Sequence, residues 1–241
     1  MQLQGITALV TGANRGLGYH LVRALLAAGA SKIYAAARNP EQLNDTVALD
    51  PERVLPVRLD LTDKAQIAAL AQKAEDIQLL VNNAGVLDFG GALETTDEVI
   101  DRNMSVNFYG TFDMSRAFAP VIEKNGGGSV VNVLTFLSFV SAPIFSAYNA
   151  SKAASWSMAM SLRPYLAPKK VSIINAFPTT IDTEMVSGLE KVKDTPADVA
   201  DDIIKDIING NEDIFPLGAK NTFQAWRQDQ KAVEEQFAKL M

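Results

Sequence analysis

One short stretch decides the fold that this chain should adopt: Thr11-Gly12-Ala13-Asn14-Arg15-Gly16-Leu17-Gly18. An apolar run ends directly before it, and apolar residues at helical spacing begin directly after it, at Tyr19. A strand, turn and helix in this order aim free backbone N–H groups and the positive helix end at a phosphate, and the glycines let the backbone approach it closely. These flanking elements favour a pyrophosphate-binding turn over a tight turn that merely needs positive φ.

Outward from this turn, short apolar runs alternate with longer stretches of helical periodicity, as in repeated βαβ units on a parallel sheet. Near-continuous apolar character predicts seven strands buried on both faces, at Ile6–Thr11, Lys32–Ala37, Val54–Arg58, Leu79–Asn82, Ser129–Leu134, Val171–Ala176 and Asp213–Phe215. The periodicity predicts helices at Gly16–Ala28, Asp63–Ala74, Asp97–Glu123, Ala147–Leu166, Pro196–Ile208 and Gln224–Leu240. We therefore expect an α/β chain, a doubly wound Rossmann fold with helices on both faces of a seven-stranded parallel sheet, and one domain over residues 1–241.

Composition excludes several kinds of function. A net charge of −6 gives no electrostatic reason to expect nucleic acid or an anionic membrane as partner. The absence of cysteine excludes disulfides and thiolate chemistry, and the single histidine, His20, is expected on the surface of the first helix with no metal-ligand cluster beside it. No apolar stretch reaches the roughly 18 residues that a membrane helix needs. We expect a soluble, cytoplasmic protein without a metal site.

The end of the second predicted strand indicates which dinucleotide is bound. An NAD-preferring site places an acidic residue about 20 positions after the glycines, to hold the ribose 2′-hydroxyl. This chain has Ala35-Ala36-Ala37-Arg38 there. Arg38 and Arg15 would form a guanidinium clamp on the 2′-phosphate of NADP(H), unless both are ordinary solvated charges.

Tyr148-Asn149-Ala150-Ser151-Lys152 places a phenol and an ammonium group four residues apart, on one face of a predicted helix. A free tyrosine titrates near pH 10, and a nearby Lys⁺ together with an oxidised nicotinamide should lower the pKa of Tyr148 toward the range useful for proton transfer. The same spacing is common on helix surfaces, so the pair gains meaning only with the upstream turn.

Taken together, these motifs resemble those of the compact, single-domain short-chain dehydrogenases/reductases. The resemblance spans most of the chain and includes Asn82-Asn83-Ala84-Gly85, Val106-Asn107-Phe108-Tyr109-Gly110 and Asp60, in matching order and spacing. It implies that Tyr148, Lys152, Thr135 and Asn107 are catalytic, with the Asn107 carbonyl holding a water molecule behind Lys152. It also implies that Asp60 contacts the adenine and that Lys152 binds the nicotinamide ribose.

The cofactor-binding residues that follow from the glycine turn, Arg38 and the resemblance are Gly12, Asn14, Arg15, Gly16, Leu17, Gly18, Arg38, Asp60, Leu61, Asn83, Ala84, Gly85, Tyr148, Lys152, Pro178, Ile181 and Thr183. Two positions depart from the family pattern. Thr135 stands where the family has a serine, and its hydroxyl can still donate a hydrogen bond to the substrate oxygen. Ser138 is the alternative donor. Pro178-Thr179 replaces the usual Pro-Gly, which should stiffen the loop that follows.

The resemblance implies interconversion of a carbonyl and an alcohol, in either direction, with NADP(H). A dinucleotide-binding regulatory or scaffold protein is the alternative, although the presence of Tyr148, Lys152 and Asn107 argues against it. Apolar candidates for the substrate pocket, some of which could belong to the core or an interface, favour a hydrophobic ketone or aldehyde. They are Val86, Leu87, Phe136, Leu137, Phe139, Ile144, Phe145, Phe177, Met185 and Val186. Asp182–Asp194 is expected to form a lid.

The long helices Asp97–Glu123 and Ala147–Leu166 resemble those through which the family forms dimers and tetramers. Trp156 and Met160 are candidate apolar contacts at such an interface, with a core position as the alternative for Trp156. The chain is therefore expected to be a homo-oligomer.

Overall fold

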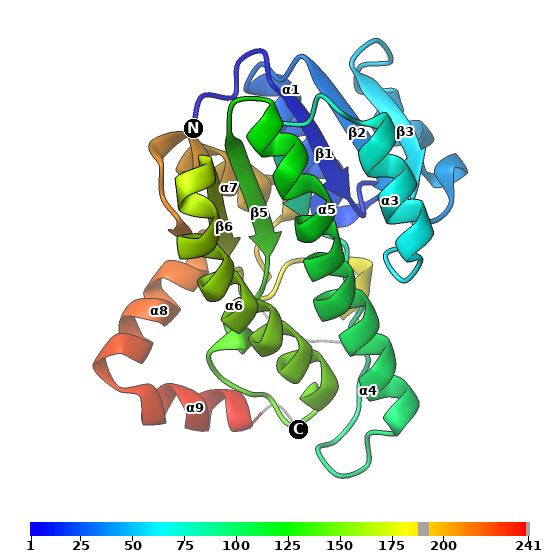
Figure 1. The fold of residues 1–241 in the computed structure, drawn as a ribbon. Coiled ribbons are helices and arrows are strands. Elements are labelled where there is room, and N and C mark those ends of the chain that lie inside the picture. Colours follow the sequence, from blue (N-terminus) through cyan, green and yellow to red (C-terminus); the bar gives the residue numbers. More distant parts are fainter. Residues whose placement is uncertain (188–192, 240–241) are drawn as a thin grey trace.

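The computed structural model describes residues 1–187 and 193–239, and its centre is a sheet of seven parallel strands (Figure 1). The strands are β1 (Thr7–Thr11), β2 (Lys32–Ala37), β3 (Val54–Arg58), β4 (Leu79–Asn82), β5 (Gly128–Val133), β6 (Val171–Ala176) and β7 (Asp213–Ile214). Their order is β3-β2-β1-β4-β5-β6-β7. The chain therefore adds β2 and β3 on one side of β1, and then adds β4 to β7 on its other side, while all strands stay parallel. Ligands bind at such a switch point, outside the carboxyl ends of the strands. The predicted doubly wound fold is confirmed.

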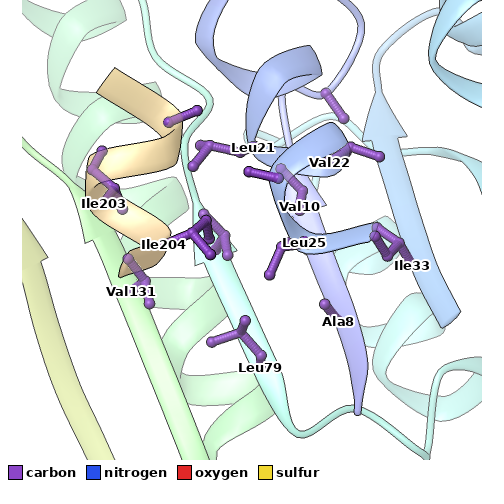
Figure 2. Close-up of a cluster of buried hydrophobic side chains, with 14 of the residues drawn as sticks. Ala8, Val10, Leu21, Val22, Leu25, Ile33, Leu79, Val131, Ile203 and Ile204 are labelled. Atoms are coloured by element: carbon purple, nitrogen blue, oxygen red, sulfur yellow. The ribbon is translucent and has the colours of Figure 1, made fainter. Parts of the chain in front are cut away.

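Helices cover both faces of the sheet. The main ones are α1 (Gly16–Ala27), α3 (Lys64–Lys73), α5 (Thr111–Lys124), α6 (Ser146–Leu166) and α7 (Pro196–Asn209), and a short α2 (Asn44–Val47) precedes β3. On one face, Leu21 of α1 and Ile203 of α7 pack over Val10 and Val131 (Figure 2). On the other face, α3, α5 and α6 contribute to a second buried apolar cluster. The two clusters hold the sheet in place, so that its carboxyl edge can carry a site.

Local sequence explains where several helices begin. Asp63 accepts hydrogen bonds from the backbone N–H groups of Ala65 and Gln66 at 2.9 and 3.1 Å, which caps α3. Thr195 caps α7 through Asp198, and α7 ends before Gly210, whose φ of +82° suits glycine. Among the described residues, no helix has the length and apolar character needed to cross a bilayer.

The predicted middle helix, Asp97–Glu123, is interrupted. It consists of α4 (Asp97–Asn103), a π-helical segment (Met104–Gly110) and α5. A π-helical turn adds a residue to the helix and re-aims its side chains, and such turns are frequent at functional sites. The segment contains Asn107, so the departure from a regular helix lies next to the predicted site.

Two further expectations were wrong. The C-terminal helix is not one element over Gln224–Leu240 but two, α8 (Gly218–Gln228) and α9 (Gln230–Ala238), while Leu240 lies outside the described residues. Continuous burial also fails for β3, whose residues are mostly exposed because β3 is an edge strand. Its Pro56 is tolerated there because an edge strand has one side without a hydrogen-bonded neighbour.

Candidate active site

A cavity of about 780 Å³ opens at the carboxyl ends of the strands, on the switch point between β1 and β4. This volume is in the range of cofactor and small-molecule sites. The predicted site residues that line it are Gly12, Asn14, Arg15, Gly16, Leu17, Gly18, Arg38, Asp60, Leu61, Asn83, Ala84, Gly85, Thr135, Tyr148, Lys152, Pro178, Ile181 and Thr183. Asn107 does not line the cavity. The structure therefore brings residues from six strand ends and α6 to one hollow.

The glycine turn forms a cradle of backbone atoms at one end of this cavity. Gly12 and Gly16 have φ values of +64° and +52°, and a Cβ on Gly18 would lie 2.0 Å from the Gly12 carbonyl oxygen. No side chain caps α1, and its first turn carries no acidic residue, so its first N–H groups stay available. The residues present therefore fit the pyrophosphate of a dinucleotide.

Asn83 holds this cradle from the neighbouring strand. Its Nδ2 donates to the carbonyl oxygens of Thr11 and Gly12 at 2.9 and 3.1 Å. The Thr11 hydroxyl in turn accepts from the backbone N–H groups of Asn83 and Ala84, each at 3.0 Å. The segment after β4 and the glycine turn are thus one hydrogen-bonded unit, which sequence spacing alone does not reveal.

The two arginines of the predicted clamp lie on the same cavity but in different surroundings. Arg38 is exposed at the end of β2. Arg15 forms an ion pair with Glu184, and the two side chains are 68% and 74% exposed. Glu184 belongs to the short helical segment after β6. In this structure, Arg15 therefore links the glycine turn to the opposite rim of the cavity.

Tyr148 lies in an apolar environment. It is 9% exposed and clusters with Ala142 and Phe145. Burial raises the pKa of Tyr148 to about 12, although a side-chain hydrogen bond with Thr135 acts in the opposite direction. The expectation that Lys152 lowers this pKa was therefore wrong for the protein alone, because desolvation of the phenolate dominates. At neutral pH the phenol is protonated.

Lys152, one turn further along α6, is also buried, at 5% exposed. Its Nζ donates to the Val133 carbonyl oxygen at 2.9 Å and lies 5.8 Å from the centre of the Tyr148 ring. Burial lowers the pKa of Lys152 to about 8. At neutral pH the ammonium group is therefore still mainly charged, and it faces the same cavity as the phenol.

Asn107 joins the segment after β4 to α6 at Ser151, the residue before Lys152. Its Oδ1 accepts from the Val86 N–H at 2.9 Å, and its Nδ2 donates to the Val86 carbonyl and to the Ser151 hydroxyl, each at 2.9 Å. The Ser155 hydroxyl lies 2.9 Å from the Asn107 carbonyl oxygen and 2.8 Å from the Ser151 carbonyl oxygen. Sequence reasoning missed Ser151 and Ser155, because serines on a helix give no functional signal by themselves.

The structure separates the two candidate hydroxyl donors. Thr135 lines the cavity, and its hydroxyl oxygen also accepts from the Leu137 N–H at 3.3 Å. Ser138 is buried away from the cavity, and its hydroxyl has no partner within the described part of the chain. Thr135 is therefore the hydroxyl placed to meet a ligand beside Tyr148.

The apolar pocket is only partly as predicted. The cavity is lined by Val86, Leu87, Phe136, Leu137, Phe145, Met185 and Val186. Phe139, Ile144 and Phe177 do not line it. The ring centre of Phe139 lies 4.8 Å from that of Phe177 in an aromatic cluster, and Ile144 packs beside Phe145. Thr222 and Phe237 line the cavity and were missed, because nothing local in the sequence marks a distant helix as part of the site.

Hydrogen bonds join the two ends of the predicted lid, Asp182–Asp194. The Asp182 N–H donates to the Asp194 carbonyl at 2.9 Å, and the Asp194 N–H donates to the Thr180 carbonyl at 3.0 Å. The Thr179 hydroxyl lies 3.5 Å from the Asp194 carboxylate, so the residue that replaces the usual glycine adds a contact here. Residues 188–192 lie outside the described part. The two ends of the loop are therefore joined on the cavity rim.

A doubly wound sheet with a glycine turn at its switch point defines a dinucleotide-binding protein of the Rossmann class. Residues 6–194 match the family described as short chain dehydrogenase. The chain belongs to this family, the short-chain dehydrogenases/reductases, and is an oxidoreductase of a kind that binds nicotinamide dinucleotides.

Relatives of the chain agree with this assignment. "Carbonyl reductase [NADPH] 2" of Sus scrofa is 35% identical over 188 residues, which are 77% of this chain and 75% of the pig protein. "Dehydrogenase/reductase SDR family member 4" of Homo sapiens is 33% identical over 184 residues, 73% of this chain and 66% of the human protein.

Solved structures extend the likeness over the whole chain. A short chain dehydrogenase from Burkholderia cenocepacia in complex with NADP is 38% identical, with a TM-score of 0.91, and the match covers 98% of this chain and 99% of that one. A short-chain dehydrogenase from Streptomyces avermitilis is 27% identical with a TM-score of 0.84, covering 100% and 98%. The C-terminal helices, which lie beyond residues 6–194, are included in both matches.

Proposed function

We propose that the protein interconverts a ketone or aldehyde and the corresponding alcohol, with NADP(H) as cofactor and Tyr148 as general acid and base. The observation that carries this proposal is the buried Tyr148 phenol on the wall of the cavity that contains the glycine cradle. Since burial keeps its pKa at about 12, the phenol is protonated at neutral pH and can donate its proton to a carbonyl oxygen.

Each neighbouring residue has a part in this scheme. The bound cofactor supplies or takes up the hydride. Tyr148 gives its proton to the carbonyl oxygen during reduction, and the Thr135 hydroxyl stabilises the negative charge that develops there. The Lys152 ammonium stabilises the phenolate and passes on a proton, while Asn107 holds the water molecule that resupplies it. The position of the Lys152 Nζ, 5.8 Å from the centre of the Tyr148 ring, supports the role of Lys152 beside the phenol.

The preference for NADP(H) rests on Arg38 and Arg15. Arg38 stands on the cavity wall where an NAD-preferring protein carries an acid, and Arg15 can turn toward the same phosphate when it leaves Glu184. The names of two similar proteins agree, since one is called an NADPH carbonyl reductase and another is described in complex with NADP.

A panel of aliphatic, aromatic and sugar carbonyls, run with NADPH and with NADH at equal concentrations, tests the proposal. We expect consumption of NADPH that depends on the carbonyl, faster with apolar ketones or aldehydes than with sugars, and weaker turnover with NADH. Equal turnover with both cofactors would contradict the NADP(H) preference. Tight NADPH binding without turnover on any carbonyl or alcohol would favour the regulatory or scaffold role instead.

We further propose that residues 1–241 form a single domain that assembles into a dimer or tetramer in the cytoplasm. Apolar side chains on the long helices support assembly: Tyr109 and Met160 are exposed at 54% and 44%. The half-buried Trp156 ring has its centre 4.2 Å from that of Phe139, which favours the alternative of a core position for Trp156. Light scattering coupled to gel filtration measures the oligomeric state directly.

A further inference from the structure

The C-terminal helix pair reaches back to the cavity that contains Tyr148. α8 ends at Gln228, where Asp229 adopts extended backbone angles (φ −147°, ψ 92°) and breaks the helix. The Asp229 side chain then accepts from the Ala232 N–H at 3.0 Å and caps α9. Both helices lie beyond the carboxyl ends of β5 and β6 (Figure 1). The break brings Phe237, near the end of α9, to the cavity wall.

An aromatic cluster attaches this helix pair to the domain. Phe223 of α8 stacks on Phe215, with 3.8 Å between the ring centres and 14° between the planes. The ring centre of Trp226, also in α8, lies 5.2 Å from that of Phe139. Val233 of α9 is buried in the same cluster. Because close packing of rings restricts movement, these contacts determine where the end of α9 lies.

Phe237 is the aromatic residue of α9 that a ligand can meet. Its ring is half-buried, and its centre lies 5.6 Å from that of Phe136, with 30° between the planes. Phe136 is fully buried and follows Thr135 directly, and all three residues line the cavity together with Tyr148. A substituent that extends from Thr135 toward α9 therefore meets the Phe237 ring, which Phe136 supports.

We propose that Phe237 is a specificity-determining residue that favours carbonyl substrates with an aryl substituent over saturated substrates of the same size. This inference rests on the proposed carbonyl chemistry at Tyr148 and Thr135. Aromatic rings at such separations attract each other beyond the effect of buried area, through offset or edge-to-face contacts, whereas a saturated ring gains only the burial.

The kcat/KM values of acetophenone and cyclohexyl methyl ketone with NADPH test the proposal. The two ketones share a carbon skeleton and differ in aromaticity, so the change in their ratio between wild type and Phe237→Leu isolates the ring contact. Leucine keeps an apolar side chain at this position. We expect Phe237→Leu to lower the aryl-to-cyclohexyl ratio by roughly three- to tenfold. An unchanged ratio would overturn the proposal.

Val233→Ala is the matched control, because Val233 helps to hold α9 but does not line the cavity. We expect it to lower the melting temperature and to lower the ratio much less than Phe237→Leu does, because the Phe237 ring and most of the cluster that places α9 remain. If it lowers the ratio as much as Phe237→Leu, Phe237 acts only by holding the helix and the proposal is wrong.

Calorimetric binding of both ketones to the protein with NADP⁺ separates this inference from the proposed reaction. A wild type that prefers the aryl ketone through Phe237, yet reduces neither ketone, would support the inference and contradict the proposed function. Reduction of both ketones, with no aryl preference that depends on Phe237, would support the proposed function and contradict the inference about Phe237.

Discussion

The two ends of the cavity are built in different ways. At the cofactor end, the walls are backbone atoms of the glycine turn and of the segment after β4, joined by hydrogen bonds from Asn83. At the substrate end, the walls are side chains, including Phe136 from the end of β5 and Phe237 from α9. A short motif is enough to specify the first kind of wall, whereas the second kind depends on contacts between residues far apart in the chain. Cofactor binding should therefore be sensitive to backbone space, and substrate choice to side-chain identity.

A methyl group added to either of two glycines that line the cavity, Gly18 or Gly218, gives the largest expected contrast. A Cβ on Gly18 would lie 2.0 Å from the Gly12 carbonyl oxygen and 2.7 Å from Asn83 Nδ2, so the cradle must shift. We expect Gly18→Ala to lower the free energy of unfolding by about 3 kcal/mol and to abolish NADPH binding. Gly218→Ala is the control, because its Cβ would lie 3.6 Å from Asp194, an ordinary contact. Thermal melts and NADPH titrations of both variants measure the contrast. Equal losses of stability and of NADPH binding in the two variants would contradict it.

Removal of a cofactor-end charge comes next. Arg38→Ala should raise the Kd of NADPH by about 10- to 30-fold and leave that of NADH unchanged, because a charge-assisted contact to the 2′-phosphate is lost. Fluorescence titration with both cofactors measures the effect. Equal weakening of both Kd values would show that Arg38 acts on the fold or on the shared part of the cofactor.

The same contrast explains how much of the structure could be predicted. The seven strands follow from apolar runs that repeat along the chain, and the glycine turn follows from its place between a strand and a helix. The position of Tyr148 beside the cavity follows from the resemblance of its motif to that of the family, together with the upstream turn. The α8–α9 break, the exclusion of Phe139 and the contribution of Phe237 do not, because they depend on which aromatic rings pack together in three dimensions. The direction of the Tyr148 pKa shift was missed because burial, which opposes the phenolate, is not visible in a four-residue spacing.

Lys152, which lies between the two ends, allows a test of burial through pH. Its pKa is about 8 in the folded protein, against an ordinary value of 10.5. Below pH 8 both the folded and the unfolded states carry the charge, so folding bears the full penalty of burying it. Between pH 8 and 10.5 the unfolded state binds more protons, so this contribution to stability rises with pH.

At pH 7, the free energy of unfolding of Lys152→Met should therefore exceed that of wild type by roughly 1–2 kcal/mol. This difference in free energy should shrink from pH 8 to 10.5. The raised Tyr148 pKa lowers stability above pH 10 in both proteins and cancels in the difference. Denaturant unfolding of both proteins from pH 7 to 10.5 measures the difference in free energy. A difference independent of pH would mean that Lys152 is not buried as a charge.

The smallest expected effect lies at the rim that joins the two ends. Glu184→Gln frees Arg15 from its ion pair on the rim of the cavity. Since exposed ion pairs contribute little, we expect NADPH to bind about two- to fivefold more tightly, with less gain for NADH. The effect should vanish in the Arg15→Ala background, where titration of the double variant supplies the control. A gain that persists without Arg15 would assign the effect to Glu184 alone.

The central claim is that the buried Tyr148 phenol transfers the proton. It is tested most directly by single-turnover carbonyl reduction with Tyr148→Phe, with the NADPH Kd measured on the same sample. Because phenylalanine keeps the ring in its apolar cluster and removes only the hydroxyl, we predict a similar melting temperature, a change in Kd of no more than about threefold, and a loss of at least about 100-fold in the rate of hydride transfer. A variant that binds NADPH and reduces the carbonyl at the wild-type rate would contradict the account.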